Sequence, residues 1–271
     1  MSNVILAILT HTESAPAVLA AATRLGTLVG GARFEVLVMR VPPVSTILVT
    51  EEVLTKEQEQ KIRSHEAERA AVLHRSFDAW AAEQTGEDGP RWIDKEGLTE
   101  TLVKEWGGRA DYIVVGQPLD HGARAEHEAL HAALFASERP VLMVPLQANS
   151  EFGKTVAVAW RDDKFTLHAV MSVLHCIPRT ADIHVLMGRR EDAPAPQIPA
   201  VLAEHGVTVT GHELPVGKDV FGALLQAKAH ELNADMLVMG AFVHSAWHNM
   251  MFGGVTKYML AHADIPVLMR H

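Results

Sequence analysis

Two short groups of residues in this sequence could form a metal site or a phosphate site. The first is the run His127-Glu128-Ala129-Leu130-His131, which spells H-E-x-x-H. On a helix this spacing places two imidazoles on one face, as zinc requires, with the glutamate as general base. However, the chain carries 16 histidines, and no Gly-x-x-His continuation follows the motif. Histidines without a catalytic role are therefore the favoured interpretation. A zinc-dependent hydrolase that uses His127, Glu128 and His131 remains the alternative.

The second group is the glycine pair Gly253 and Gly254, which stands just before a segment with helical character, Lys257 to His262. Glycines at a helix N-terminus let a phosphate approach the free N–H groups, and the helix dipole favours the anion. The same pair would also serve in a plain loop. Whether this glycine pair forms a phosphate site depends on the strands and helices that precede it.

Those elements occur twice in the chain. Ala110–Gly116 (ADYIVVG) returns as Ala234–Gly240 (ADMLVMG), and Pro140–Met143 (PVLM) returns unchanged as Pro266–Met269. Two matched segments in the same order predict two copies of one domain. We expect domains at 1–145 and 154–271, joined by a polar linker.

Each copy alternates short apolar runs with segments of helical spacing. The predicted strands are Val4–Leu9, Phe34–Met39, Arg91–Asp94, Ala110–Gly116 and Pro140–Met143 in the first copy, and Val156–Trp160, Ile183–Met187, Val207–Thr210, Ala234–Gly240 and Pro266–Met269 in the second. The predicted helices are Ala15–Leu28, Glu51–Gln84 and Gly97–Trp106, then Phe165–Cys176, Pro199–His205, Gly217–Leu232 and Lys257–His262. This alternation predicts an α/β protein with two tandem flavodoxin-like domains, each a doubly wound, five-stranded parallel sheet.

The order of these elements predicts where a ligand would bind. In doubly wound sheets the crevice lies beyond the carboxyl ends of the strands, where the first and fourth strands meet. The fourth strand of the second copy ends at Met239 and Gly240, and Gly253 and Gly254 follow it. The glycine pair is therefore a candidate phosphate site.

The segment Glu51 to Gln84 is much longer than its counterpart in the second copy. It carries an apolar stripe between charged residues, which predicts an amphipathic helix, broken once, that packs on its own sheet. The alternative is a surface for a partner.

The repeated segments, together with Gly240, His244-Ser245 and the run Gly253-Gly-Val-Thr256, resemble the universal stress protein family in its tandem form. The resemblance implies ATP binding through Gly-x2-Gly-x9-Gly-Ser/Thr and dimerisation through the last strand. It implies an adenine-nucleotide site in the second copy, with these residues: Met239, Gly240, His244, Gly253, Gly254, Val255 and Thr256.

The chain departs from the family pattern at several positions. Val243 replaces the second glycine, and Gly254 stands at the Ser/Thr position. The acid after the first strand, which serves ribose or metal in the family, falls on Arg161, so the resemblance gives little support for magnesium. In the first copy His127 and Glu128 replace the glycine pair, so we expect that copy to be degenerate and to bind no nucleotide.

Composition narrows the remaining classes of function. The 24 basic and 33 acidic residues give a net charge of −9, which argues against a nucleic-acid coat or a polybasic membrane patch. No apolar run reaches the roughly 18 residues of a membrane span. Cys176 is the only cysteine, which fits a reducing compartment and an inert, buried thiol. We expect a cytoplasmic protein without nucleic-acid or membrane partners.

Two further hypotheses follow for the chain. The favoured one is a stress-response protein that binds ATP in its second copy, with no catalysis or only slow hydrolysis. Bound ATP would stabilise one conformation that a partner recognises, and the partner would be a second copy of the chain or a regulatory protein. No nucleophile, base and orienting group come together in the sequence, so an efficient enzyme is not expected. The alternative is a nucleotide-free dimeric interaction scaffold in which both sites have decayed.

Overall fold

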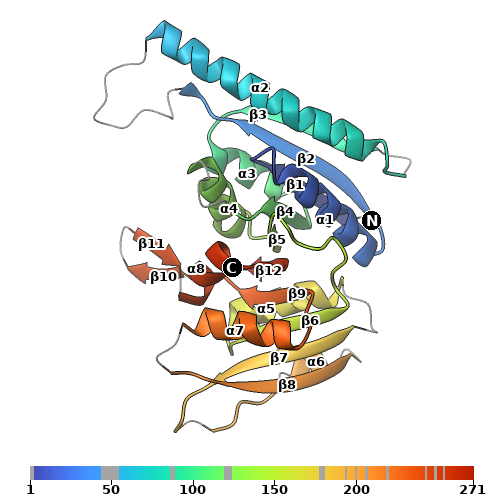
Figure 1. The fold of residues 1–271 in the computed structure, drawn as a ribbon, viewed down its shortest axis with the longest axis vertical. Helices are drawn as coiled ribbons and strands as arrows, with labels where there is room; N and C mark the ends of the chain where they lie inside the picture. Colours follow the sequence, from blue (N-terminus) through green and yellow to red (C-terminus); the bar gives the residue numbers. More distant parts are fainter. Residues whose placement is uncertain are drawn as a thin grey trace.

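A ten-stranded sheet with helices on both faces forms the body of the molecule (Figure 1). The computed structural model describes residues 3–43, 55–85, 89–118, 124–176, 181–192, 194–198, 200–204, 207–217, 220–241, 243–246, 249–252 and 254–271. The first half of the chain gives β1 (Asn3–Leu9), α1 (Ala15–Leu28), β2 (Ala32–Arg40), α2 (Lys56–Ala81), β3 (Arg91–Glu96), α3 (Thr99–Gly107), β4 (Tyr112–Gly116), α4 (Arg124–Ala136) and β5 (Val141–Val144). The second half gives β6 (Thr155–Trp160), α5 (Lys164–Leu174), β7 (Asp182–Arg189), α6 (Ala200–Glu204), β8 (Thr208–Pro215), α7 (Phe221–Glu231), β9 (Met236–Gly240), β10 (Val243–Ala246), β11 (Asn249–Phe252), α8 (Gly254–His262) and β12 (Val267–Arg270).

The strand order is β3-β2-β1-β4-β5-β12-β9-β6-β7-β8, so the two halves repeat one order and meet at their last strands. Within each half neighbouring strands are parallel, as the predicted α/β fold requires. The β5–β12 pair is antiparallel, with Leu142 opposite Leu268. The last strand of each half is therefore paired inside the polypeptide. The family resemblance led us to expect pairing of last strands between two copies of the chain.

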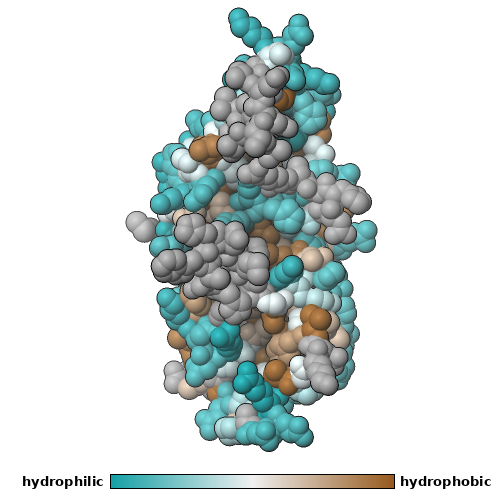
Figure 2. Space-filling view, turned by 90° about the vertical axis from the view of Figure 1, so that its left-hand side faces the viewer, coloured by the Kyte–Doolittle hydropathy of each residue, from teal (hydrophilic) through white to brown (hydrophobic). Residues whose placement is uncertain are grey.

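The strands are apolar without alternation because helices cover both faces of the sheet. Ile5, Leu6, Ala7 and Ile8 are consecutive in β1, and each is at most 1% exposed. Their side chains divide between two buried clusters, one on each face. The face of the molecule seen in Figure 2 is largely hydrophilic, with apolar residues in small patches on its coloured part.

The repeated Ala-Asp pair has the same structural role in both halves. The Asp111 carboxylate accepts the N–H of Val4 at 2.8 Å, and the Asp111 N–H donates to the carbonyl of Val4 at 2.8 Å. The Asp235 carboxylate likewise accepts N–H groups at the start of β6, and its own N–H donates to the carbonyl of Thr155 at 2.8 Å. In each half this aspartate ties the start of the fourth strand to the start of the first.

The predicted break in the segment Glu51 to Gln84 is wrong for the described part, because α2 runs from Lys56 to Ala81 as one helix. No glycine or proline lies within it, so nothing interrupts the backbone hydrogen bonds. Thr55 and Gln58 form a capping box at its start. The predicted apolar stripe packs on the sheet through Ala70, Leu73, Phe77 and Trp80, all of them buried. Residues 51–54 lie outside the described residues.

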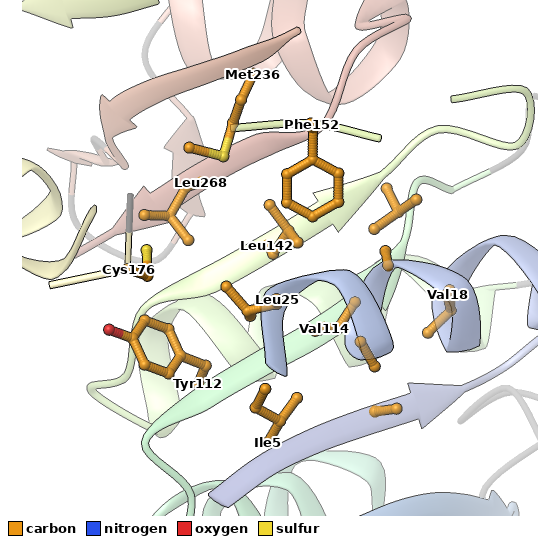
Figure 3. Close-up of a cluster of buried hydrophobic side chains, with 14 of the residues drawn as sticks. Ile5, Val18, Leu25, Tyr112, Val114, Leu142, Phe152, Cys176, Met236 and Leu268 are labelled. Atoms are coloured by element: carbon orange, nitrogen blue, oxygen red, sulfur yellow. The ribbon is translucent and has the colours of Figure 1, made fainter. Parts of the chain in front are cut away.

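The segment predicted as a polar linker packs against the core. Phe152 is completely buried, and its carbonyl accepts a hydrogen bond from Arg24 Nε at 2.8 Å. Figure 3 shows its ring close to Leu142 of β5 and Met236 of β9, one from each half. The first buried cluster therefore runs through both halves.

Within the described part of the chain, no helix combines the length and the apolar character needed to cross a bilayer.

Candidate functional site

A pocket of about 230 Å³ lies where the carboxyl ends of β6 and β9 meet the start of α8. Its lining comprises Ala159, Trp160, Arg161, Leu186, Phe221, Leu225, Met239, Gly254, Val255 and Thr256. This is the edge of the sheet at which doubly wound proteins bind their ligands. Of the seven predicted site residues, the structure brings four together here: Met239, Gly254, Val255 and Thr256.

The start of α8 is open toward this pocket. The helix begins at Gly254, and a Cβ built on Gly254 would meet no atom of the described residues within 4 Å. No acidic residue stands in its first turn, so no carboxylate of the helix itself offsets the positive end of the helix dipole. The start of α8 therefore has the backbone features of an anion site.

The other three predicted site residues are placed differently. Gly240 is buried as the last residue of β9, where it pairs with Arg270 of β12, and it does not line the pocket. His244 lies in β10, which pairs with β11 as an antiparallel hairpin. Gly253 lies outside the described residues.

The position of the family's acidic residue is occupied by a cation. Arg161 lines the pocket, and its Nε lies 3.4 Å from Oδ2 of Asp163. The other oxygen of Asp163 caps α5 by accepting the N–H groups of Phe165 and Thr166, each at 3.0 Å. None of the ten lining residues is acidic. These residues do not fit a magnesium ion, which prefers carboxylate oxygens.

In the first half, α2 lies against the carboxyl ends of β1 and β2. Arg69 of α2 donates to the carbonyls of Thr10 at 3.0 Å and Met39 at 2.6 Å, at the carboxyl ends of β1 and β2. It also pairs with Glu66 at 2.8 Å. Burial alone would raise the pKa of Glu66, but the Arg69 guanidinium and the N–H of Val41 hold that pKa below its usual value. A side-chain ion pair thus occupies the end of these two strands.

The helix α4 also differs from α8. By the spacing of the repeated PVLM segments, Glu128 is the counterpart of Gly254. The helix begins at Arg124, about one turn before this counterpart. The N–H groups at this position are therefore within the helix, and a carboxylate stands beside them. A phosphate would find no free amides there.

The H-E-x-x-H motif lies on α4, as predicted. His127 is exposed and His131 half-buried, and both line a cavity of about 500 Å³ between α3 and α4. Burial lowers the pKa of His131, whose ring packs against Phe135 with centroids 4.8 Å apart. Among the side chains that the structure describes, no three His, Cys, Asp or Glu residues are arranged to hold a metal ion. The zinc hypothesis gains no third ligand from this part of the chain.

Cys176 is buried, as the sequence predicted. Burial raises the pKa of its thiol to about 12, so the reactive thiolate is not formed near neutral pH. Figure 3 shows the hydroxyl of Tyr112 pointing toward this thiol, and that hydroxyl donates to the carbonyl of Ser172 at 3.0 Å. Cys176 is a packing residue at the junction of the two halves.

Several lining residues of the α8 pocket were not singled out from the sequence. Trp160 is the last residue of β6, so the rule that ligands bind at strand ends would have pointed to it. Phe221 and Leu225 lie four residues apart on α7, a spacing that puts them on one helix face. That this face meets the pocket depends on tertiary packing, which the sequence pattern does not give.

Comparison with known families identifies the second half. Residues 142–271 match the model of the Universal stress protein family. The second half of the chain belongs to the universal stress protein family. A comparison with curated proteins gave no match.

Solved structures extend the likeness in fold to both halves. The crystal structure of a universal stress protein from Archaeoglobus fulgidus DSM 4304 aligns over 100% of this chain and 98% of its own, with a TM-score of 0.66 and 13% identity. A functionally unknown protein from Pseudomonas aeruginosa PAO1 aligns over 99% of this chain and 92% of its own, with a TM-score of 0.56 and 15% identity. At such low identity these similarities show a shared fold.

Proposed function

We propose that the chain is a tandem universal stress protein that binds an adenine nucleotide, ATP, in its second half. The observation that carries this proposal is the open start of α8 at Gly254, within a pocket at the carboxyl ends of β6 and β9. In this proposal the phosphates lie against the first N–H groups of α8.

The lining of the pocket suits the rest of the nucleotide. The side chains of Trp160, Phe221 and Leu225 give apolar and aromatic surface for a purine ring. Arg161 supplies a positive charge at the mouth, where a polyphosphate would need one. Because the lining holds no carboxylate, we propose binding that does not depend on magnesium.

The same lining supports a binding function over catalysis. None of the ten lining residues is a histidine, an aspartate or a glutamate, so the described lining of the pocket holds no general base to activate water. We therefore expect ATP hydrolysis to be absent or slow. Bound ATP would instead stabilise one arrangement of α8 for a regulatory protein in the cytoplasm, where a lone thiol stays reduced.

The pairing of β5 with β12 bears on the proposed assembly. It places the two halves in the arrangement that separate copies would form through their last strands. A homodimer of this chain would have to use another surface, since both last strands already have a partner on each side.

The proposal is tested by denaturing the purified protein, chromatographing any small molecule released, and measuring ATP binding by calorimetry. Gly254→Glu places a carboxylate on the phosphate position without steric conflict with the described residues. Acidic residues stabilise helix N-termini, so the variant keeps its fold. We expect ATP binding to weaken at least about tenfold, the equivalent of about 1.4 kcal/mol.

Gly217→Glu is the matched control. A Cβ on Gly217 also meets nothing within 4 Å, and this residue does not line the pocket. We expect it to bind ATP like the natural chain. If the natural chain releases no nucleotide and binds none at millimolar ATP, the proposal fails and the interaction scaffold takes its place.

A further inference from the structure

Two histidines face each other near the far edge of the sheet, in the second half of the chain. His184 lies on β7 and His212 on the edge strand β8. Nδ1 of His184 is 3.1 Å from Nε2 of His212, and the ring centroids are 5.2 Å apart. Both side chains are half-buried.

The register of the two strands creates this contact. His184 is opposite Thr210 and Leu186 is opposite His212, so the histidines are diagonal neighbours in a parallel pair. Side chains at alternate positions share a face, and Leu186 and Leu214 on that face pack in the cluster that contains Leu225 of α7. The two imidazoles therefore lie on the face that α7 covers.

The separation of the two nitrogens suits a metal ion. Two nitrogens bound to one ion at 2.0–2.1 Å with a tetrahedral angle are about 3.3 Å apart. The observed 3.1 Å is close to this value, and rotation of the two rings would direct both lone pairs at one ion. In the absence of a metal, the two facing nitrogens share at most one proton between them.

The charged groups that face the pair belong to α7. Lys228 is paired with Glu231 at 2.7 Å, so the helix brings a positive and a negative charge together to this face.

We propose that His184 and His212 form a two-histidine binding site for a late first-row divalent metal ion such as Cu²⁺, Ni²⁺ or Zn²⁺. Within the described part of the chain no third His, Cys, Asp or Glu joins them, so water completes the coordination. Such an open site binds its ion exchangeably. It shares no residue with the α8 pocket and does not depend on nucleotide binding.

The test is titration of the full-length protein with Cu²⁺, followed by electron paramagnetic resonance. We expect the tightest equivalent to show two nitrogen ligands. His184→Gln and His212→Gln each remove one ligand while keeping a polar side chain of similar length. Each should weaken this equivalent by more than about tenfold, since even indirect partners of metal ligands contribute that much.

His168→Gln is the matched control, because His168 is exposed on α5 and away from the pair. It should leave the tightest equivalent unchanged. Equal Cu²⁺ affinity in the double variant His184→Gln/His212→Gln overturns the proposal. A first equivalent with fewer than two nitrogen ligands in the natural chain also overturns it, independently of how the variants fold.

Discussion

At the residue scale, the Ala-Asp pair that occurs in both halves has a structural role. The aspartate of the repeated Ala-Asp pair holds the start of the first strand in both halves, and it lies far from the carboxyl ends where ligands bind. Asp235 accepts hydrogen bonds from three consecutive N–H groups, those of Gly153, Lys154 and Thr155. Asp111 accepts one, from Val4. The same motif therefore contributes unequally to the two halves.

Asp235→Ala should lower the free energy of unfolding by about 1–3 kcal/mol, because it leaves several N–H groups without their acceptor. Asp111→Ala should cost less. Urea denaturation of both variants measures the difference. Equal costs, or a larger cost for Asp111→Ala, would contradict this reading of the repeat.

Acid should destabilise the protein through its half-buried histidines. Burial lowers the pKa of both His131 and His212 in the folded state from 6.5. The unfolded chain then binds more protons below this value, so stability decreases as the pH falls through about 6.5 toward the folded pKa values. Glu66 has a lowered pKa from 4.5, so its contribution is lost only at more acidic pH.

Urea midpoints measured at pH 7.5 and 5.5 test this expectation. His131→Gln removes one of the two groups and should reduce the difference between the two midpoints. If the variant shows the same pH dependence as the natural chain, His131 is not one of the groups responsible.

At the element scale, α2 is fixed to the sheet by a partly buried ion pair as well as by its apolar stripe. Glu66 and Arg69 each have 18% exposed side chains, and Arg69 reaches the ends of two strands. Removing one member leaves the other with a charge in a partly desolvated place. The long helix that distinguishes the first half is thus bound at the carboxyl ends of β1 and β2.

Arg69→Leu should destabilise the protein by about 1–3 kcal/mol, because partly buried Glu66 loses its cation and the carbonyls of Thr10 and Met39 lose their donor. Adding Glu66→Gln to this variant should recover part of the loss. Arg63→Leu is the control, since its pair with Glu96 is 49% and 35% exposed, and such pairs contribute at most about 1 kcal/mol. A similar loss in both single variants, measured in urea, would argue against this role of Arg69.

The sequence predicted the elements better than their limits. Strands buried on both faces are continuous apolar runs, and β1, β4 and β9 were found for that reason. The edge strand β8 continues to Pro215, beyond the predicted Thr210. The sequence missed this extension because Gly211–Glu213 are polar or small, as an edge strand with no neighbour on one side allows. Gly254 was found through a topological rule, and Met239, Val255 and Thr256 through the family resemblance. Trp160 and Phe221 join the pocket through packing that no local pattern records.

At the scale of the whole molecule, the two halves share one core. The β5–β12 pairing joins the sheets, Tyr112 donates to the carbonyl of Ser172 across the junction, and Gln117 Nε2 donates to the carbonyl of Leu260 at 3.1 Å. Phe152 fills the space between them. We therefore expect both halves to unfold together.

Phe152→Ala should lower the free energy of unfolding by about 3–5 kcal/mol, the usual cost of emptying a buried aromatic site. Tryptophan fluorescence and circular dichroism should report coincident transitions in the natural chain. Leu98→Ala, at a residue that is 59% exposed, should change stability by less than about 0.5 kcal/mol. Two separate transitions would show that the halves unfold independently.

The internal pairing of β5 with β12 also has a consequence for how the protein responds to dilution. Subunits that meet through their last strands separate when their concentration falls, whereas halves joined by a peptide segment keep a constant effective concentration. Both halves are also made in equal number and always side by side. The two halves can therefore differ, as they do in the long helix α2 and its ion pair, because each half always meets the other and never a second copy of itself.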